Sequence, residues 1–333
     1  MRLFGVIAVV VGALSGVAEA GPFSSKSSQG ELARRSVDRT YALPKGWLEL
    51  GLRVEHKSSA HYRGADGGLR EQPSGMTWQH SRAWLEVQQG FSNRVTLYAR
   101  IPYVRSSLLP ATGNDITTLA MGDAHTGVMF QPVRFDSIDW AFSADLKAPS
   151  GVEWPKDTGG PRNTGSFLTG TGITNVGLFT HVAWRYNGLL KASASTGYVR
   201  KIPGIVGYVV ATEGFGNGVI NPGDEWTSTA DLQGNVTDYA WARVGAQFRR
   251  VGQAKIGING DGDRQMDPVR HSAGQWLDVR ASVGFEPTEH WLVEGGVSMD
   301  RIGGDTRPFA HLGLEEFSPQ PGLEWSGKVA VRW

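Results

Sequence analysis

The sequence contains no cysteine, and after its first twenty residues it has no apolar run long enough to cross a bilayer as a helix. Without cysteine there is neither a lipid-modified N-terminal anchor nor a disulfide framework, so stability must come from hydrogen bonds and burial. A membrane-spanning helix needs about 20 apolar residues, which excludes a helical membrane protein. An excess of one charge is also lacking, since 33 Lys and Arg are balanced by 32 Asp and Glu. That balance gives no basic patch for nucleic acid, so no nucleic-acid partner is expected.

Glycine and tryptophan, by contrast, are plentiful. The chain has 45 glycines and 12 tryptophans among its 333 residues, whereas glycine makes up about 7% of an average soluble domain. The length allows one large domain or two ordinary ones.

The first twenty residues have the organisation of a cleaved export signal. Arg2 supplies the positive charge, residues 3–17 are apolar, and Ala18-Glu19-Ala20 fits the small-x-small cleavage rule. We expect cleavage between Ala20 and Gly21, with residues 1–20 as the signal peptide. A retained anchor is disfavoured because the apolar stretch is shorter than the roughly 20 residues that span a bilayer.

Most of the remaining chain alternates between apolar and polar residues with a period of two, which is typical of strands with two different faces. In residues 46–56, for example, Leu52 and Val54 lie on one face and Arg53 and Glu55 on the other. The stretches with this pattern are 46–56, 79–89, 93–104, 122–131, 139–148, 174–186, 189–200, 239–249, 253–260, 275–286, 290–300 and 323–333.

The connections between these stretches are asymmetric. Short turns follow every second strand, at GFSN, PVRFDSI, NG, VGQ and EPTEH, and long loops follow the others. This layout, with an even strand number, is typical of outer-membrane barrels with short periplasmic turns and long extracellular loops. A hairpin within 201–238 would raise the count from about twelve to about fourteen strands. The predicted long loops are 57–76, 105–121, 149–173, 201–238, 261–274 and 301–322.

Several features favour a membrane barrel over a soluble one, in which the apolar face would point inward. The strands are long enough to cross a bilayer when tilted, and their apolar faces carry no Asp, Glu, Lys or Arg. Large aromatic residues gather at the short-turn ends of these faces, where amphipathic rings meet headgroups. The last strand ends with Val329, Val331 and Trp333 on the apolar face, which is similar to the signal read by the barrel assembly machinery.

The polar face is predicted to line the lumen. One interpretation is a polar conduit that slightly favours anions, because charged rings set the selectivity of a pore. The other is a narrow lumen held shut by opposite charges. Several large aromatic residues are predicted to point inward as well, and they could stack on a hydrophobic solute or only fill space. They are Trp78, Trp84, Tyr98, Phe179, Trp241 and Trp276. The candidate lumen-lining residues are Arg53, Arg82, Trp84, Glu86, Tyr98, Arg100, Asp145, Lys147, Phe179, Arg185, Arg243, Asp278, Arg280 and Glu294.

No enzymatic activity, cofactor or metal is expected. The loop with Asp261, Asp263 and Asp267 lacks the glycine and distal glutamate of an EF-hand loop, which favours a plain turn. No serine is predicted to lie where it would form a nucleophilic dyad with a histidine such as His181.

Four segments, GFSNRVTLYARIPYV, MGDAHTGVMFQP, ADLKAPSG and GTGITNVGLFTHVAWRYNGLLKASASTGYVRK, occur in this order within residues 43–201. Together they resemble the outer-membrane proteins grouped under the MetA pathway of phenol degradation. Ile101-Pro102, Gly122-Asp123, Lys147-x-Pro149-Ser150-Gly151 and Gly170-x-Gly172 occupy the motif positions, with Ser150 replacing the usual Thr. The resemblance implies passage of hydrophobic or aromatic compounds, and it implies no catalytic residue.

The sequence thus predicts an all-β, transmembrane, antiparallel up-and-down barrel over residues 45–333, after a periplasmic tail or small plug at 21–44. The expected function is an outer-membrane channel or transporter for small solutes of Gram-negative cells. The alternative is a non-conducting structural or adhesive barrel whose long loops bind outside the cell. The expected partners are the lipid bilayer, the barrel assembly machinery and a small-molecule solute.

Overall fold

The computed structural model describes residues 40–333 except 60, 64–68, 72–76, 110–115, 136, 151–172, 187, 212–213, 222, 259–266, 269–272, 304–318 and 321–322. The predicted signal peptide, its cleavage site and residues 21–39 lie outside the described part of the chain. Within it, no helix is long and apolar enough to span a membrane.

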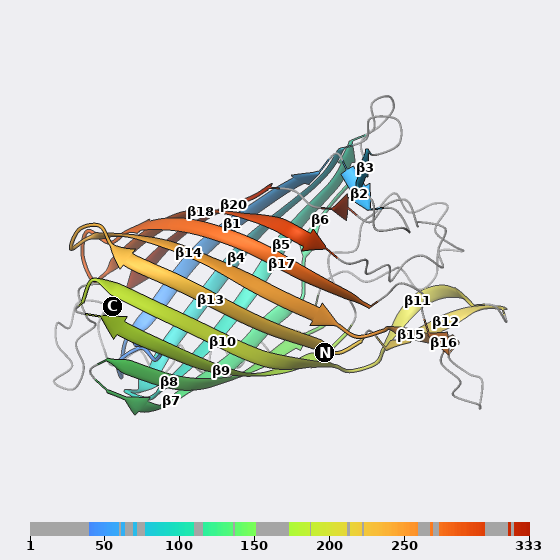
Figure 1. Ribbon diagram of the computed structural model, residues 1–333. Coiled ribbons are helices and arrows are strands. Elements are labelled where there is room, and N and C mark those ends of the chain that lie inside the picture. Colours follow the sequence, from blue (N-terminus) through green and yellow to red (C-terminus); the bar gives the residue numbers. More distant parts are fainter. Residues whose placement is uncertain are drawn as a thin grey trace.

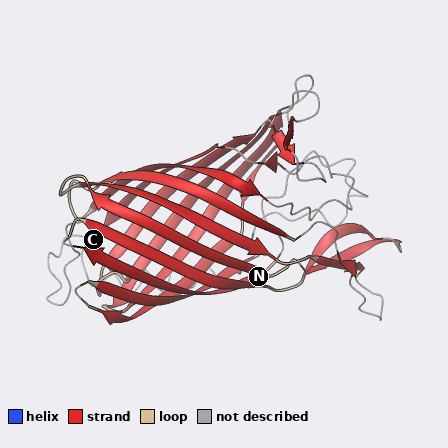
Figure 2. Cartoon of the chain, viewed as in Figure 1, coloured by secondary structure: helices blue, strands red, loops and turns tan. Residues whose placement is uncertain are grey.

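Twelve long antiparallel strands form a closed barrel (Figures 1 and 2). Each strand pairs with its neighbours around the ring, and β1 pairs with both β4 and the C-terminal β20, which closes the barrel. The predicted all-β twelve-stranded antiparallel barrel is therefore confirmed. Its strands are β1 (Leu48–Ser59), β4 (Thr77–Ser92), β5 (Val95–Leu109), β7 (Ala124–Arg134), β8 (Ile138–Ala148), β9 (Asn175–Tyr186), β10 (Leu190–Lys201), β13 (Glu225–Asn235), β14 (Ala240–Val251), β17 (Gly274–Phe285), β18 (Trp291–Gly303) and β20 (Leu323–Arg332).

The two ends of the barrel differ. At one, which we call the short-turn end, five short turns join the strands, and β1 begins beside the end of β20. The opposite, long-loop end carries the remaining short strands (Figure 1). There β6 (Ile116–Met121) extends the pairing of β5, and two small sheets form. These are β11 (Gly204–Ala211), β12 (Gly214–Asn221), β15 (Lys255–Ile258) and β16 (Asp267–Pro268) in one, and β2 (His61–Arg63), β3 (Leu69–Glu71) and β19 (Pro319–Gln320) in the other.

The sequence prediction was wrong between residues 201 and 260. β13 is a barrel strand that the prediction placed inside a long loop, whereas the predicted strand 253–260 leaves the barrel and contributes β15 to a separate sheet. The VGQ turn consequently lies at the long-loop end, and residues 236–239 make the short turn between β13 and β14. The hairpin β11–β12 also stays outside the barrel, so fourteen strands are excluded. The two errors cancelled in the count.

The outer face of the barrel is the predicted apolar face. Leu52, Leu85, Leu178 and Val283 are each more than half exposed there, although they are large apolar residues. In water such exposure would be costly, while a lipid environment stabilises it. One member of the predicted face differs, because Leu48 is buried next to the C-terminal residue at the short-turn end.

Candidate functional site: the inner wall of the barrel

All fourteen residues predicted to line the lumen lie on strand positions that alternate with the exposed apolar ones. We call this side the inner face. The structure brings these side chains into contacts with one another or with further polar residues of the same face, described below. Their role in lining a conducting pore remains a prediction.

Five buried charged residues form a cluster where the first and last strands meet. In this seam cluster, the Lys328 ammonium lies 2.8 Å from carboxylate oxygens of both Glu49 and Glu86. Arg332 donates to Glu49 at 2.5 Å and to Glu286 at 3.0 Å. All five are less than a tenth exposed. Ion pairs of β20 with β1, β4 and the end of β17 thus lie across the seam that closes the ring.

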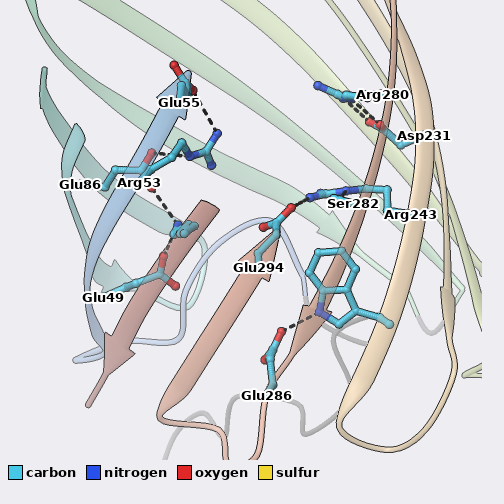
Figure 3. A network of polar contacts seen from close by, with 12 residues as sticks. Glu49, Arg53, Glu55, Glu86, Asp231, Arg243, Arg280, Ser282, Glu286 and Glu294 are labelled. Carbon is cyan, nitrogen blue, oxygen red and sulfur yellow. Dashed lines mark hydrogen bonds and ion pairs between the residues drawn. The ribbon is translucent and has the colours of Figure 1, made fainter. Parts of the chain in front are cut away.

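The seam cluster continues along β1 and β4. Arg53 Nε lies 3.3 Å from Glu86, and the Trp84 indole donates to Glu55 at 2.9 Å. Arg82 approaches the same Glu55 at 4.0 Å. Figure 3 shows Arg53 between Glu55 and Glu86, together with the pairs Arg280–Asp231 and Arg243–Glu294 that are described next.

On the wall from β13 to β18, the ion pairs of Arg280 and Arg243 join strands that are separated by one other strand, and a glycine or serine of the middle strand lies beneath each of these pairs. Arg280 donates two hydrogen bonds to Asp231, at 2.9 and 2.6 Å. These residues lie on β17 and β13, and Gly245 of the intervening β14 pairs with both. A Cβ on Gly245 would lie 2.1 Å from the Asp231 carboxylate, so only glycine leaves room for this bidentate pair.

The same wall holds two further pairs. The Arg243 guanidinium contacts Glu294 and donates to Ser282 at 3.3 Å (Figure 3). Arg249 lies 3.4 Å from Asp278. Opposite, Lys147 pairs with Asp123 at 2.9 Å, and Arg185 pairs with Asp139 at 2.9 Å.

These ion pairs run along the wall. Their partners lie on adjacent strands, on strands separated by one other, or in the turns and termini next to them. A lumen held shut by charge pairs would need contacts between opposite walls. The inner-face pairs that the structure describes join residues of the same stretch of wall. They neutralise charge without bridging the lumen.

The inward aromatic rings also lie against the wall. A Cβ on Gly197 would be 2.0 Å from the Phe179 ring, and a Cβ on Gly127 would be 2.5 Å from the Tyr98 ring. Each ring therefore covers a glycine of a neighbouring strand. Tyr98 also donates its hydroxyl to Asp145, and Arg100 lies over its ring at 5.5 Å.

Trp241 and Trp276 follow the same pattern. The Trp241 ring lies over Gly284 and donates to Glu286 at 3.1 Å, and it is 5% exposed. Trp276 is also buried, with Arg249 above it at 5.5 Å. The inward aromatic residues were expected either to bind a solute or to fill space. Trp241 and Trp276 fill space against the wall. The side chain of Trp78 lies outside the described residues.

Sequence reasoning missed four of the inner-face carboxylates and two hydroxyl–imidazole contacts. Glu225 and Asp231 were assigned to a loop, while Asp139 and Glu286 lie at strand ends next to turns, where the alternation gives little signal.

Contrary to prediction, two serines contact histidines. Ser143 Oγ lies 3.0 Å from His181 Nε2, and Ser81 Oγ lies 2.9 Å from His56 Nδ1. A nucleophile needs in addition a group that orients the base and a site for the oxyanion, so these contacts alone do not indicate catalysis.

The C-terminal residue is held at the short-turn end. Leu48 donates to the Trp333 carbonyl at 2.8 Å, and the Trp333 amide donates back to Leu48 at 3.0 Å. Val329 is exposed on the outer face, and Val331 and Trp333 are half-buried. Their role as an assembly signal stays a prediction.

No group of three or more metal-ligating side chains is found in the described part of the chain. Asp261 and Asp263 of the acidic loop lie outside it, and for Asp267 only the backbone is described.

Comparison with known proteins gives a fold and no family. No protein-family model matches the chain, and no curated protein matches it. The chain is similar to the COG4313 outer membrane channel from Pseudomonas putida F1, with a TM-score of 0.68 and 12% identity over 91% of this chain and all of that one. The NanC porin and a mutant of the TodX monoaromatic hydrocarbon channel give TM-scores of 0.44 and 0.41, at 8% and 10% identity. These cover 85% and 90% of this chain, and 98% and 92% of theirs.

The fold is similar to that of the COG4313 outer membrane channel. The resemblance to the MetA-pathway proteins, which the sequence motifs suggested, remains a prediction.

Proposed function

We propose that the protein is an outer-membrane channel that lets small solutes pass through its barrel. The observation that carries the proposal is the course of the inner-face ion pairs along the wall. A barrel that serves only as a scaffold has no need to keep paired charges out of its axis. A water-filled pathway does need this, because contacts between opposite walls would close it.

The long-loop end is proposed to face outward and the short-turn end the periplasm, as in other bacterial barrels. The same proposal includes export by a signal at residues 1–20, which is cleaved between Ala20 and Gly21. The barrel assembly machinery would then insert the protein into the bilayer of the outer membrane, reading Val329, Val331 and Trp333.

Ion selectivity should be weak. Four inner-face carboxylates add to those expected from sequence, and they pair with arginines, a lysine or a tryptophan; they are Asp139, Glu225, Asp231 and Glu286. The slight preference for anions that the sequence suggested therefore loses its basis, since the charges that line the wall are largely neutralised by neighbours.

For substrate class, hydrophobic or aromatic compounds are the narrower proposal. It rests on the resemblance of residues 43–201 to the MetA-pathway proteins, and on the rings of Tyr98 and Phe179, which lie against the inner wall. Vesicle swelling with aromatic acids and with sugars of equal size tests it. Faster entry of the aromatic acids is expected, and equal rates would leave only the general channel.

The second candidate is a structural or adhesive barrel that binds partners through its long loops. It is favoured by the separate sheet of β11, β12, β15 and β16 at the long-loop end, which extends beyond the barrel wall (Figure 1). Recordings of the purified protein in planar bilayers separate the two candidates. The channel predicts stepwise ion currents, whereas the structural barrel predicts none.

A further inference from the structure

The chain segment just before β1 lies inside the barrel. Going backwards from β1, the Gly46 amide donates to Gly90 of β4 at 2.8 Å, and the Lys45 amide donates to Asn93 at 2.9 Å. The Leu43 amide then donates to the Thr96 hydroxyl at 2.7 Å. Thr96 belongs to the inner face of β5, because it lies two residues from the inward Tyr98.

The segment then continues to β7 and beyond. The Ala42 amide donates to Gln131 Oε1 of β7 at 3.0 Å. The Tyr41 ring lies 5.5 Å from the His181 ring of β9, and the Lys191 ammonium of β10 lies 5.4 Å from the same Tyr41 ring. Residues 41–47, which we call the strap, therefore make successive contacts from β4 to β10.

This path reaches the opposite side of the barrel. Around the ring of twelve strands, β10 is the sixth strand from β1. The strap begins beside β1 in a turn, because the Trp47 amide donates to the Pro44 carbonyl at 3.1 Å and Gly46 has a φ of 84°. From this turn residues 41–43 cross the inner face, where Leu43 contacts β5, Ala42 contacts β7 and Tyr41 contacts β9 and β10.

The wall beneath the strap is shaped to receive it. The inward residues Ala141 and Ala183 are fully buried, although small residues facing an open lumen would be exposed. A Cβ on Gly90 would lie 2.0 Å from the Pro44 carbonyl oxygen, so glycine is required at this contact. Inward residues of the other wall are also buried at this end, where Ala330 is 1% and Leu292 5% exposed next to Trp241.

A buried chain of polar contacts fixes the acceptor for Ala42. Gln131 is 2% exposed and donates its Nε2 to Asp139 at 2.9 Å. Asp139 is in turn paired with Arg185 at 2.9 Å. With its amide nitrogen donating to Asp139, Gln131 can only turn its oxygen toward the strap.

From these contacts we propose that the strap spans half of the short-turn mouth and sets the size limit for solutes that pass through the barrel. The proposal rests on the channel function and makes it more specific. A solute that moves along the β5–β10 side has to pass the strap. Tyr41 and Lys191 would be the last groups that it meets on the strap side.

Single-channel conductance tests the proposal. Replacing the strap residues by Tyr41→Gly, Ala42→Ser, Leu43→Gly and Pro44→Ser in the full chain removes the ring contacts and the stiffness. Side chains that project into a pore narrow it, so their removal should raise conductance by about twofold. Larger sugars should then enter vesicles as well.

Tyr239→Ala is the matched control for a single Tyr41→Ala variant, because Tyr239 lies at the same end in the turn between β13 and β14. The control should conduct like the wild type, while Tyr41→Ala should conduct more. Heat-modifiable migration in gels establishes that each variant is folded. If the variant with all four strap substitutions is folded and conducts like the wild type, the strap proposal is wrong and the channel function stands. If neither that variant nor the wild type gives a current, the channel function itself is wrong.

Hydrogen exchange gives a second, independent readout. The Leu43 amide should be protected in the wild type and in Thr96→Ser, which keeps the hydroxyl acceptor, and it should exchange faster in Thr96→Ala. Rapid exchange of this amide already in the folded wild type would show that the strap is not held inside the barrel, and would overturn the proposal.

Discussion

Lys328 offers the most demanding test of the seam cluster. It is 8% exposed, and its ammonium contacts Glu49 and Glu86 at 2.8 Å each. The substitution Lys328→Met keeps the length of the side chain and removes the charge. Both carboxylates then lose a partner while they stay buried.

The cost follows from what the two carboxylates retain. Removing one partner of a buried ion pair costs about 3–5 kcal/mol, because an uncompensated charge remains. Here Glu49 still has Arg332 at 2.5 Å, and Glu86 still has Arg53 at 3.3 Å. The loss should therefore fall near the lower limit, about 3 kcal/mol, which is on the order of a hundredfold in the unfolding equilibrium.

Urea unfolding in lipid vesicles, followed by tryptophan fluorescence, measures this free energy. The matched control is Arg200→Met, since Arg200 also forms an ion pair, with Asp224 at 3.2 Å, but its side chain is 66% exposed. An exposed pair is worth only about 0–1 kcal/mol. Adding Glu86→Gln to Lys328→Met should recover part of the loss because it removes one uncompensated charge. Equal losses for Lys328→Met and Arg200→Met would refute the reasoning.

Three further predictions concern the two faces and the C-terminus. Gly197→Val should destabilise the barrel by about 1–3 kcal/mol through overpacking, and Phe179→Ala in the same chain should relieve it; no relief in urea unfolding would mean that the ring does not cover this glycine. Val279→Arg on the outer face should cost about 2–4 kcal/mol in the same assay, whereas Gln247→Arg on the inner face should cost about 0–0.5 kcal/mol; equal costs would contradict the assignment of the faces. Trp333→Ala should lower the yield of folded barrel in outer-membrane fractions, and an unchanged yield would remove its role in assembly.

The strand pattern could be read from the sequence wherever the outer face consists mainly of large apolar residues. The outer face of β9 is interrupted only by Thr180, with Val182 and Trp184 outward and Arg185 inward, and the bounds of this strand were predicted closely. β13 fails this criterion, because Ser228 and Ala230 lie on its outer face between Trp226 and Leu232. The alternation in 253–260 is cleaner, yet that segment pairs outside the barrel. Periodicity is local, so it cannot tell which sheet a strand joins.

Inward orientation was predictable from parity, while the partners were not. The sequence placed Arg280 and Arg243 inside, but the pairing of Arg280 with Asp231 depends on the register of β13, β14 and β17 and on the gap at Gly245. The strap contacts depend on the path of a chain segment with no periodicity. Tertiary geometry decides both the ion-pair partners and the strap contacts. Local sequence patterns do not show which distant residues will meet.

Recordings of the purified full chain in planar bilayers test the central claim most directly. The account predicts stepwise currents with a reversal potential near zero in a salt gradient, because the wall charges are paired. It also predicts higher conductance when the strap residues are replaced. A folded protein that stays silent with and without the strap contacts would contradict it.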